Sequence, residues 1–176
     1  MRLDNTLDIH AHTGPLRADA VVCVDPTERA CLPDGQGWLS VGVHPWNAER
    51  ADAETWARME RWLDDPRVVA VGEVGLDRLR GPAMDVQERV FMRQVDMAAQ
   101  RGLPVVVHCV RAVDVLLRLR RATKRAGQWV VHGFRGKAAT ARQLLDAGID
   151  ISFGERHDAE AFAAVPPERR YRETDR

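Results

Sequence analysis

Short apolar runs, rich in valine and isoleucine, recur along the chain and alternate with turns or longer mixed stretches. Most of these runs are continuous rather than alternating, which is typical of parallel strands that are buried on both faces. They predict eight strands, at residues 7–12, 20–24, 38–44, 68–74, 104–109, 129–134, 149–153 and 170–175.

Several of the intervening segments carry apolar residues at helical spacing. The clearest runs from Asp85 to Arg101, and Gly102 ends its pattern. The segments predicted as helices are residues 51–64, 85–101, 111–126 and 138–147. Strand and helix in regular succession predict an α/β protein, a (β/α)8 TIM-type barrel formed by residues 1–176 as a single domain.

The length of the chain is short for this fold. It has 176 residues, whereas barrels of this type usually need about 200 or more. Only Arg176 follows Asp175, so we expect a compact barrel that apparently lacks the last helix. Two explanations stay open: the chain is truncated, or a second subunit of a homo-oligomer covers an open seam between the last strand and the first.

Composition excludes some classes of protein. The formal net charge is zero, so the chain as a whole has no electrostatic attraction to nucleic acid or membranes. The basic stretch at residues 118–125 is interpreted as the solvated outer face of a helix. No apolar run approaches the roughly 20 residues that span a bilayer, and because polar residues interrupt the first segment we expect no signal peptide there. The three cysteines are interpreted as reduced thiols in a cytoplasmic protein.

Side chains that bind metals well stand at the ends of five predicted strands. Parallel strands deliver their C-terminal residues to one mouth of a barrel, where barrel enzymes keep their active sites. A single histidine in such a place is more often structural, but the joint pattern predicts a metal centre. Its expected ligands are His10, His12, Glu73, His108, His132 and Asp175. Asp8 is expected to be a hydrogen-bond partner of these ligands, with a role as a ligand itself as the alternative.

The mixed imidazole and carboxylate ligands indicate one or two divalent ions, with Mg, Mn and Zn all suitable. Glu73 is placed to bridge two ions, and Asp175 to bind one of them or to deprotonate its water. Both are therefore candidate catalytic residues. Four residues near the mouth are expected to contact substrate: His44, for which a structural role is the alternative, and Arg111, Arg135 and Lys137, which suit phosphate.

The ordered set of motifs resembles the TatD family of metal-dependent hydrolases, within the amidohydrolase-like superfamily, and in particular a compact bacterial branch of it. The motifs are DIHAH, VGVHPW, VGEVGLD, VVVHC, VVHGF, ISFGE and RETD, and together they cover nearly the whole chain. Each motif alone is weak, but their order is highly specific.

The resemblance implies how the ligands are shared. His10, His12, Glu73 and Asp175 would hold one ion, and Glu73, His108 and His132 would hold the second. It also implies deoxyribonuclease activity, typically from the 3′ end, with His44 near the scissile phosphate. The likeness is poorer around the substrate: Val110 stands where the family usually has arginine, and Gly133 begins GFRG in place of Cys-Phe-Ser-Gly.

Three functions follow as hypotheses. The first is a phosphodiesterase acting on DNA or a small phosphate ester through a two-metal-activated water. The second is hydrolysis of a small cyclic amide or ester, as in other amidohydrolase-like barrels. Many of those use a carboxylated lysine at a strand end, and neither Lys124 nor Lys137 stands at such a position. The third is a non-catalytic binding barrel, which has no need of costly buried charges.

Overall fold

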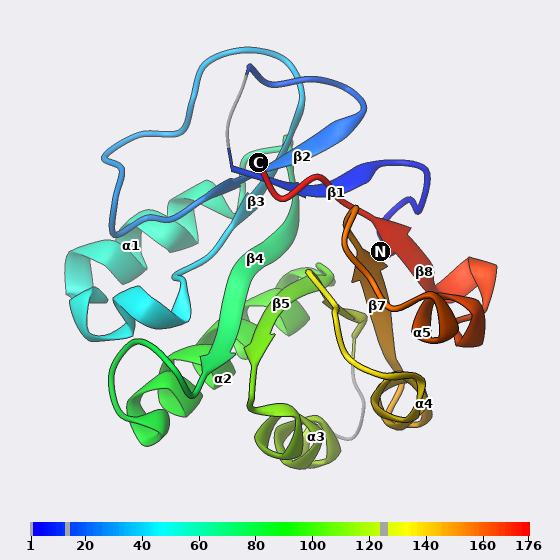
Figure 1. Ribbon diagram of the computed structural model, residues 1–176. Helices are drawn as coiled ribbons and strands as arrows, with labels where there is room; N and C mark the ends of the chain where they lie inside the picture. The colour runs from blue at the N-terminus through cyan, green and yellow to red at the C-terminus, as the bar shows by residue number, and fades with distance from the viewer. Residues whose placement is uncertain (1, 13–14, 124–126) are drawn as a thin grey trace.

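The computed structural model describes residues 2–12, 15–123 and 127–176, which form a closed barrel of eight parallel strands (Figure 1). Each strand pairs with the next along the chain, and the last pairs with the first. The strands are β1 (Asp8–Ala11), β2 (Ala20–Val24), β3 (Trp38–Val41), β4 (Val68–Asp77), β5 (Val105–Val110), β6 (Trp129–Val131), β7 (Ile149–Phe153) and β8 (Arg170–Arg172).

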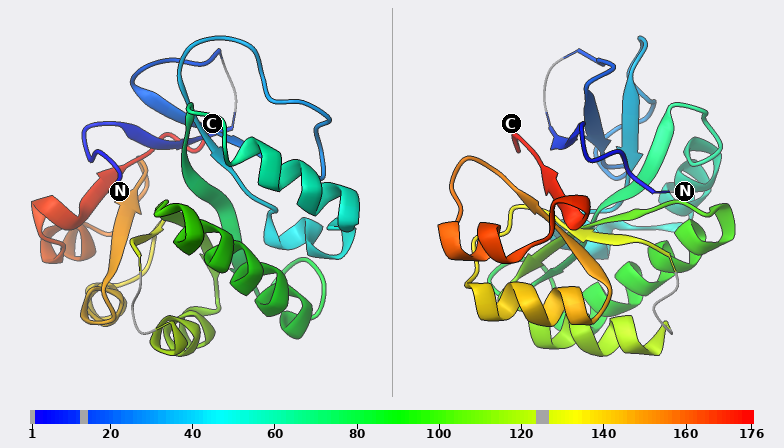
Figure 2. Two further views of the ribbon diagram at one scale, coloured as in Figure 1. Left: turned by 180° about the vertical axis from the view of Figure 1, so that it is seen from behind. Right: turned by 90° about the vertical axis from the view of Figure 1, so that its right-hand side faces the viewer.

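Helices lie outside the barrel along part of its circumference, while loops border β1 and β2 (Figures 1 and 2). The described residues of the first two connections form no helix, whereas every connection from β3 to β8 contains one. The helices are α1 (Ala53–Trp62), α2 (Met84–Arg101), α3 (Val113–Ala122), α4 (Ala138–Asp146) and α5 (Ala159–Ala164), with short 3-10 turns η1 (Pro45–Arg50) and η2 (Pro167–Arg169).

The predicted TIM-type barrel is confirmed, and the strand ends account for most differences. β4 is longer than predicted and ends at Asp77, while β3 ends at Val41 and β8 at Arg172. As a result, His44 and Asp175 stand beyond their strands. Twisted strands diverge at the mouth of a barrel, so the ladder stops there and the polar residues continue as loops.

The basic stretch of α3 differs from its interpretation as a solvated face. Arg120 is buried, its guanidinium lies 4.8 Å over the ring of Trp129, and it donates to the carbonyls of Gly127 and Gly148. The expectation was therefore wrong for this residue, although Arg118 is exposed. Lys124 lies outside the described residues.

The seam between β1 and β8 is closed within one chain. Asp8 pairs with Arg172 in the sheet, and its carboxylate accepts hydrogen bonds from the amide and hydroxyl of Thr174 at 3.1 and 2.7 Å. The amide of Asp175 then donates to the carbonyl of His10. The ring of strands needs no second subunit to complete it, so the seam is not open as expected. Residues 173–176 form no helix, and assembly into an oligomer stays a prediction.

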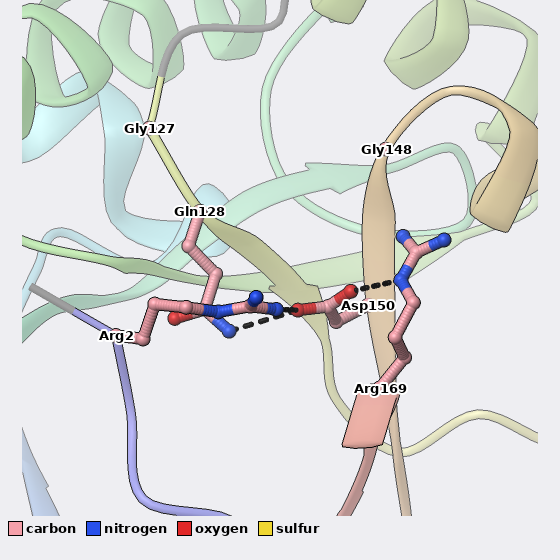
Figure 3. Close-up of a pocket in the computed structure, with 6 residues that line it drawn as sticks. All are labelled: Arg2, Gly127, Gln128, Gly148, Asp150 and Arg169. Carbon is pink, nitrogen blue, oxygen red and sulfur yellow. Dashed lines mark hydrogen bonds and ion pairs between the residues drawn. The ribbon is translucent and has the colours of Figure 1, made fainter. Parts of the chain in front are cut away.

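A polar cluster occupies the opposite end of the barrel, at the N-terminal ends of the strands. Figure 3 shows Arg2, Gln128 and Arg169 converging on the buried carboxylate of Asp150, with contacts of 2.9, 2.8 and 2.6 Å. These groups line a cavity of about 340 Å³. Three side chains donate hydrogen bonds to the carboxylate of Asp150. Residues at this end of a barrel usually contribute to stability rather than to catalysis.

Two further expectations concern the character of the chain. Among the described residues, no helix is both long and apolar enough to cross a membrane. All three cysteines, Cys23, Cys31 and Cys109, are free thiols. The cytoplasmic location inferred from them stays a prediction.

Candidate metal centre

Glu73 of β4 is the centre of a cluster of histidines at the C-terminal mouth of the barrel. Its carboxylate is buried, and five imidazole nitrogens lie within 3.5 Å of its oxygens. They belong to His10, His12, His44, His108 and His132. Parallel strands that end at one mouth bring these residues together, as the sequence predicted.

One group of candidate ligands surrounds Oε2 of Glu73. Nε2 of His10 and Nε2 of His12 lie 3.1 Å apart, and they lie 3.3 and 3.5 Å from that oxygen. Oδ1 of Asp175 lies 3.6 and 3.4 Å from the same two nitrogens. Asp175 has a φ of 53°, a left-handed conformation that aspartate tolerates better than most residues. Residues in such sparsely populated backbone conformations are often found at functional sites.

A second group surrounds the other oxygen of Glu73. Nδ1 of His108 and Nε2 of His132 both lie 2.7 Å from Oε1. Two residues before these histidines, β5 and β6 place the buried side chains of Val106 and Val130 on the same face, so an apolar layer lies beneath the imidazoles. A carboxylate with one oxygen toward each group is arranged as a bridge.

Each histidine of the second group has another carboxylate behind it. Oδ2 of Asp77 lies 3.2 Å from Nε2 of His108, and it accepts the indole N–H of Trp46 at 2.7 Å. Oε1 of Glu173 lies 3.6 Å from Nδ1 of His132. Such outer carboxylates fix the orientation and tautomer of a ligating imidazole.

The charges of the cluster are strongly coupled. Burial would raise the pKa of Glu73, but the charge of His132 and hydrogen bonds from His10, His108 and His132 hold that pKa well below its usual range. Burial would lower the pKa of His132, but Glu73 and Glu173 outweigh it and raise that pKa well above its usual range. Burial lowers the pKa of His10, and the charge of His132 adds to the effect. Glu73 and His132 therefore stabilise each other's charged forms.

The donor set fits divalent cations. Ligand atoms about 2.0–2.2 Å from an ion lie about 3–4 Å from one another, which is the spacing found between His10, His12 and Asp175. Among the residues that the structure describes, three sets have ligand atoms within 4.8 Å of one another: His10 with His12 and Glu73, His10 with His132 and Asp175, and Glu73 with His44 and His108. The lone pairs of two ring nitrogens that lie as close as Nε2 of His10 and Nε2 of His12 repel each other unless a proton or a cation lies between them.

His44 suits a substrate contact better than a metal ligand. It caps η1, and its Nδ1 accepts the backbone N–H of Trp46 at 3.2 Å. The neutral ring must then carry its proton on Nε2, which lies 3.2 Å from Oε1 of Glu73 and faces the cavity. A nitrogen that carries a proton donates a hydrogen bond and cannot ligate an ion.

The other three residues expected to contact substrate lie at different distances from the cluster. Arg135 is exposed and lines a cavity of about 130 Å³ together with Asp175 and Arg156. Lys137 pairs with Asp158 at 2.7 Å at the start of α4, and Arg111 lines a depression on the flank of α3. Neither of the last two lines the cavities that contain the cluster, so their contact with substrate stays a prediction.

The structure adds residues that the sequence reasoning did not select. Asp77 and Glu173 stand behind the ligands, and Trp46 and Cys23 line a cavity of about 450 Å³ beside Glu73. The Sγ atom of Cys23 accepts the backbone N–H of Glu73 at 2.9 Å. The period of two along a strand was the available signal for two of them, because Asp77 and Glu173 lie four and two residues from chosen ligands.

Comparison with known proteins agrees with this centre. The chain is 34% identical over 160 residues to the uncharacterized metal-dependent hydrolase TatD of Mycobacterium tuberculosis, covering 84% of this chain and 61% of that protein. It is 34% identical over 151 residues to the 3′-5′ ssDNA/RNA exonuclease TatD of Erwinia billingiae, covering 80% of this chain and 58% of that protein. The chain thus spans about three fifths of the length of these curated relatives.

A solved structure and a family model complete the comparison. The crystal structure of YjjV, a TatD homologue from Escherichia coli, superposes with a TM-score of 0.75 and 26% identity, over 89% of this chain and 66% of that one. The sequence model of the family described as TatD related DNase matches residues 28–176, which include Glu73, His108, His132 and Asp175. The chain belongs to the TatD-related DNase family.

Proposed function

We propose that this protein is a divalent-metal-dependent phosphodiesterase that removes nucleotides from the 3′ end of single-stranded DNA. The observation that carries the proposal is the buried carboxylate of Glu73, which presents one oxygen to each of two groups of imidazoles. The relatives named as 3′-5′ ssDNA/RNA exonucleases support the choice of substrate. We include in the proposal a single domain, residues 1–176, because both ends of the chain supply ligands.

The residues that would hold two cations, Mg, Mn or Zn, are His10, His12 and Asp175 on one side of Glu73 and His108 and His132 on the other. Such ions would supply Lewis-acid polarisation of the phosphoryl oxygens and a water acidic enough to attack near neutral pH. Glu73 keeps the two groups at a fixed separation and offsets their positive charge.

Two further residues would handle protons and substrate oxygens. The hydrogen bond from His12 holds the pKa of Asp175 below its usual range, and burial opposes this only in part, so the carboxylate is ionised at neutral pH. It is partly exposed at the mouth and can accept a proton from attacking water. His44 can turn its Nε2–H from Glu73 to a phosphate oxygen in the same cavity.

The test is release of label from single-stranded DNA by wild type and by Glu73→Gln, in matched reactions with and without added Mg²⁺ or Mn²⁺. We expect 3′-labelled DNA to lose its label first, 5′-labelled DNA to shorten gradually, and Glu73→Gln to lose activity by at least about 100-fold. Glu54→Gln, a change on the exposed face of α1, is the control and should match wild type.

The competing functions give other results. If a panel of cyclic amides and lactones is hydrolysed while DNA and small phosphodiesters are not, the protein acts as an amidohydrolase. If the folded protein binds neither Mn²⁺ nor Zn²⁺ in a calorimeter, it is a binding barrel and the proposal is wrong.

A further inference from the structure

A tryptophan stands exposed beside the metal centre. Trp46 is 44% exposed and lines the cavity of about 450 Å³ that also contains Glu73, His44 and His108. Among the described residues, the large exposed hydrophobic side chains are Trp38, Trp46 and Leu79, and only Trp46 lines this cavity. A ring exposed at the mouth of the barrel offers a ligand a flat apolar surface to cover.

The ring is held rigidly although it is exposed. Its indole N–H donates to Oδ2 of Asp77 at 2.7 Å, and its backbone N–H donates to Nδ1 of His44 at 3.2 Å. Pro45, the first residue of η1, restricts the backbone just before it. A preorganised aromatic surface loses little conformational freedom when a ligand stacks on it.

The indole ring of Trp46 has imidazole and guanidinium groups around it, which can contact the phosphate and the base of a nucleotide. On the side of the centre, the imidazole of His44 lies 4.7 Å away, centroid to centroid, and that of His108 lies 6.1 Å away. Away from the centre, the guanidinium of Arg80 lies 4.8 Å over the indole. The Asp77 carboxylate fixes this loop as well, because its Oδ1 accepts the backbone N–H groups of Leu79 and Arg80.

We propose that Trp46, together with Arg80, forms a stacking subsite for the unpaired nucleobase next to the scissile phosphate. The inference rests on the proposed function, and it makes nucleotides, rather than small aliphatic phosphate esters, the substrate class. Aromatic rings and guanidinium groups that stack on bases are a general means of holding single strands. A base must leave its duplex partner to lie there, so the subsite selects single strands.

The one amide side chain that lines this cavity in the described part of the chain is not free to read the identity of a base. Asn47, the nearest amide of the cavity wall, is occupied: its amide nitrogen donates to Asp25 and Glu28, and its oxygen accepts from Arg50. Stacking alone tolerates every base, since each has a π face. Discrimination among the four bases should therefore be weak.

Binding is tested by calorimetry with two probes in Mg²⁺ buffer, dAMP and 2-deoxyribose 5-phosphate, which differ only in the base. We expect wild type to bind dAMP roughly 10-fold or more tightly than the sugar phosphate, which corresponds to about 1–3 kcal/mol of stacking. Trp46→Ala should bind both probes equally. Trp46→Phe, which keeps a ring but loses the bond to Asp77, should keep most of the preference for dAMP.

The matched control is Trp38→Phe, because Trp38 is 37% exposed but stands at the N-terminal end of β3, far from the mouth. This variant should retain the full preference for dAMP. Wild type without any preference, or a Trp46→Ala variant that keeps it, would overturn the inference.

A second measurement separates this inference from the proposed function. Wild type should show a KM for a 3′-terminal nucleotide roughly 10-fold below that for a 3′-terminal abasic residue, and Trp46→Ala should lose that ratio. Preferential binding of dAMP without any DNA hydrolysis would reject the function and keep the subsite. If wild type hydrolyses DNA with a 3′-terminal nucleotide and DNA with a 3′-terminal abasic residue at equal KM, the proposed function stands and the stacking subsite is rejected.

Discussion

The carboxylate of Asp77 lies 3.2 Å from Nε2 of His108, on the side of the ring opposite to Glu73. Nδ1 of His108 lies 2.7 Å from Oε1 of Glu73 and hydrogen-bonds to it. If a cation took the place of that hydrogen bond, a ring proton shared between Nε2 and Asp77 would leave Nδ1 free to act as a ligand. Asp77 would thereby determine which nitrogen of the imidazole is available for a metal ion.

We predict that Asp77→Asn weakens binding of Mn²⁺ by about 10- to 100-fold, because the amide no longer holds His108 in its ligating tautomer. Calorimetric titration of the folded variant measures this. Asp85→Asn, which removes a charge from an exposed pair with Arg89 on α2, is the control. Equal affinities for Mn²⁺ in Asp77→Asn and wild type would show that His108 needs no such support.

The affinity for divalent ions should rise with pH. In the protein without a cation, Glu73 and Glu173 outweigh burial and raise the pKa of His132 well above its usual range, so the ring is protonated at neutral pH. A cation that takes Nε2 must release this proton, and binding tightens as pH rises toward that pKa, by up to about tenfold per pH unit for one proton. Titrations at pH 7 in PIPES and in Tris, whose ionisation enthalpies differ, should give different apparent heats. Identical heats would contradict proton release.

Replacement of Gly75 should be strongly destabilising. A Cβ there would lie 2.0 Å from the carbonyl oxygen of His108, and the φ of 149° is one that other residues rarely adopt. We expect Gly75→Ala to lower the free energy of unfolding by on the order of 4 kcal/mol in urea. Gly102→Ala is the control: its φ of 63° is also unusual, but nothing lies within 4 Å of the added Cβ, so it should lower that free energy by about 1 kcal/mol. Similar losses in both variants would refute the proposed clash.

The cluster around Asp150 should affect stability and not metal binding. Asp150→Ala leaves Arg2, Gln128 and Arg169 without their shared acceptor, and we expect unfolding in urea to become about 2–4 kcal/mol easier. The affinity for Mn²⁺ should be unchanged, because the cluster lies at the other end of the strands. Asp146→Ala, an exposed change at the end of α4, should alter stability by no more than about 0.5 kcal/mol. A large loss of affinity for Mn²⁺ in Asp150→Ala would contradict this separation.

The barrel and the residues around Glu73 were accessible from the sequence because they depend on local signals. Valine runs mark buried strands, and a histidine such as His108 or His132 directly after such a run has to stand at the mouth. Strand ends were less accessible. The C-terminal ends of β3 and β4 depend on pairing with neighbouring strands. No residue near Val41 or Asp77 marks these ends in the sequence.

Roles that depend on distant partners were missed. Glu173 and Asp77 gain their importance from the ring nitrogens of His132 and His108, which come from other strands. Arg120 is basic and stands in a basic stretch, yet Trp129 and two carbonyl groups provide it with a buried place. A charged side chain is therefore predicted to be exposed, but tertiary contacts can bury it when they supply hydrogen-bond acceptors and an aromatic surface.

If the cluster around Glu73 binds a cation, the closed seam between β1 and β8 would make that binding depend on completed folding. His10 and Asp175 are 165 positions apart, and they meet only when the last strand has docked against the first. A cation that needs both binds the finished ring and leaves partly folded chains alone. At a free concentration 100 times its Kd, such an ion would stabilise the ring by about 2.7 kcal/mol. The ion would thus hold the first and last strands of the barrel together. A shortage of divalent metal during growth would then lower the stability of the folded protein as well as its catalytic activity.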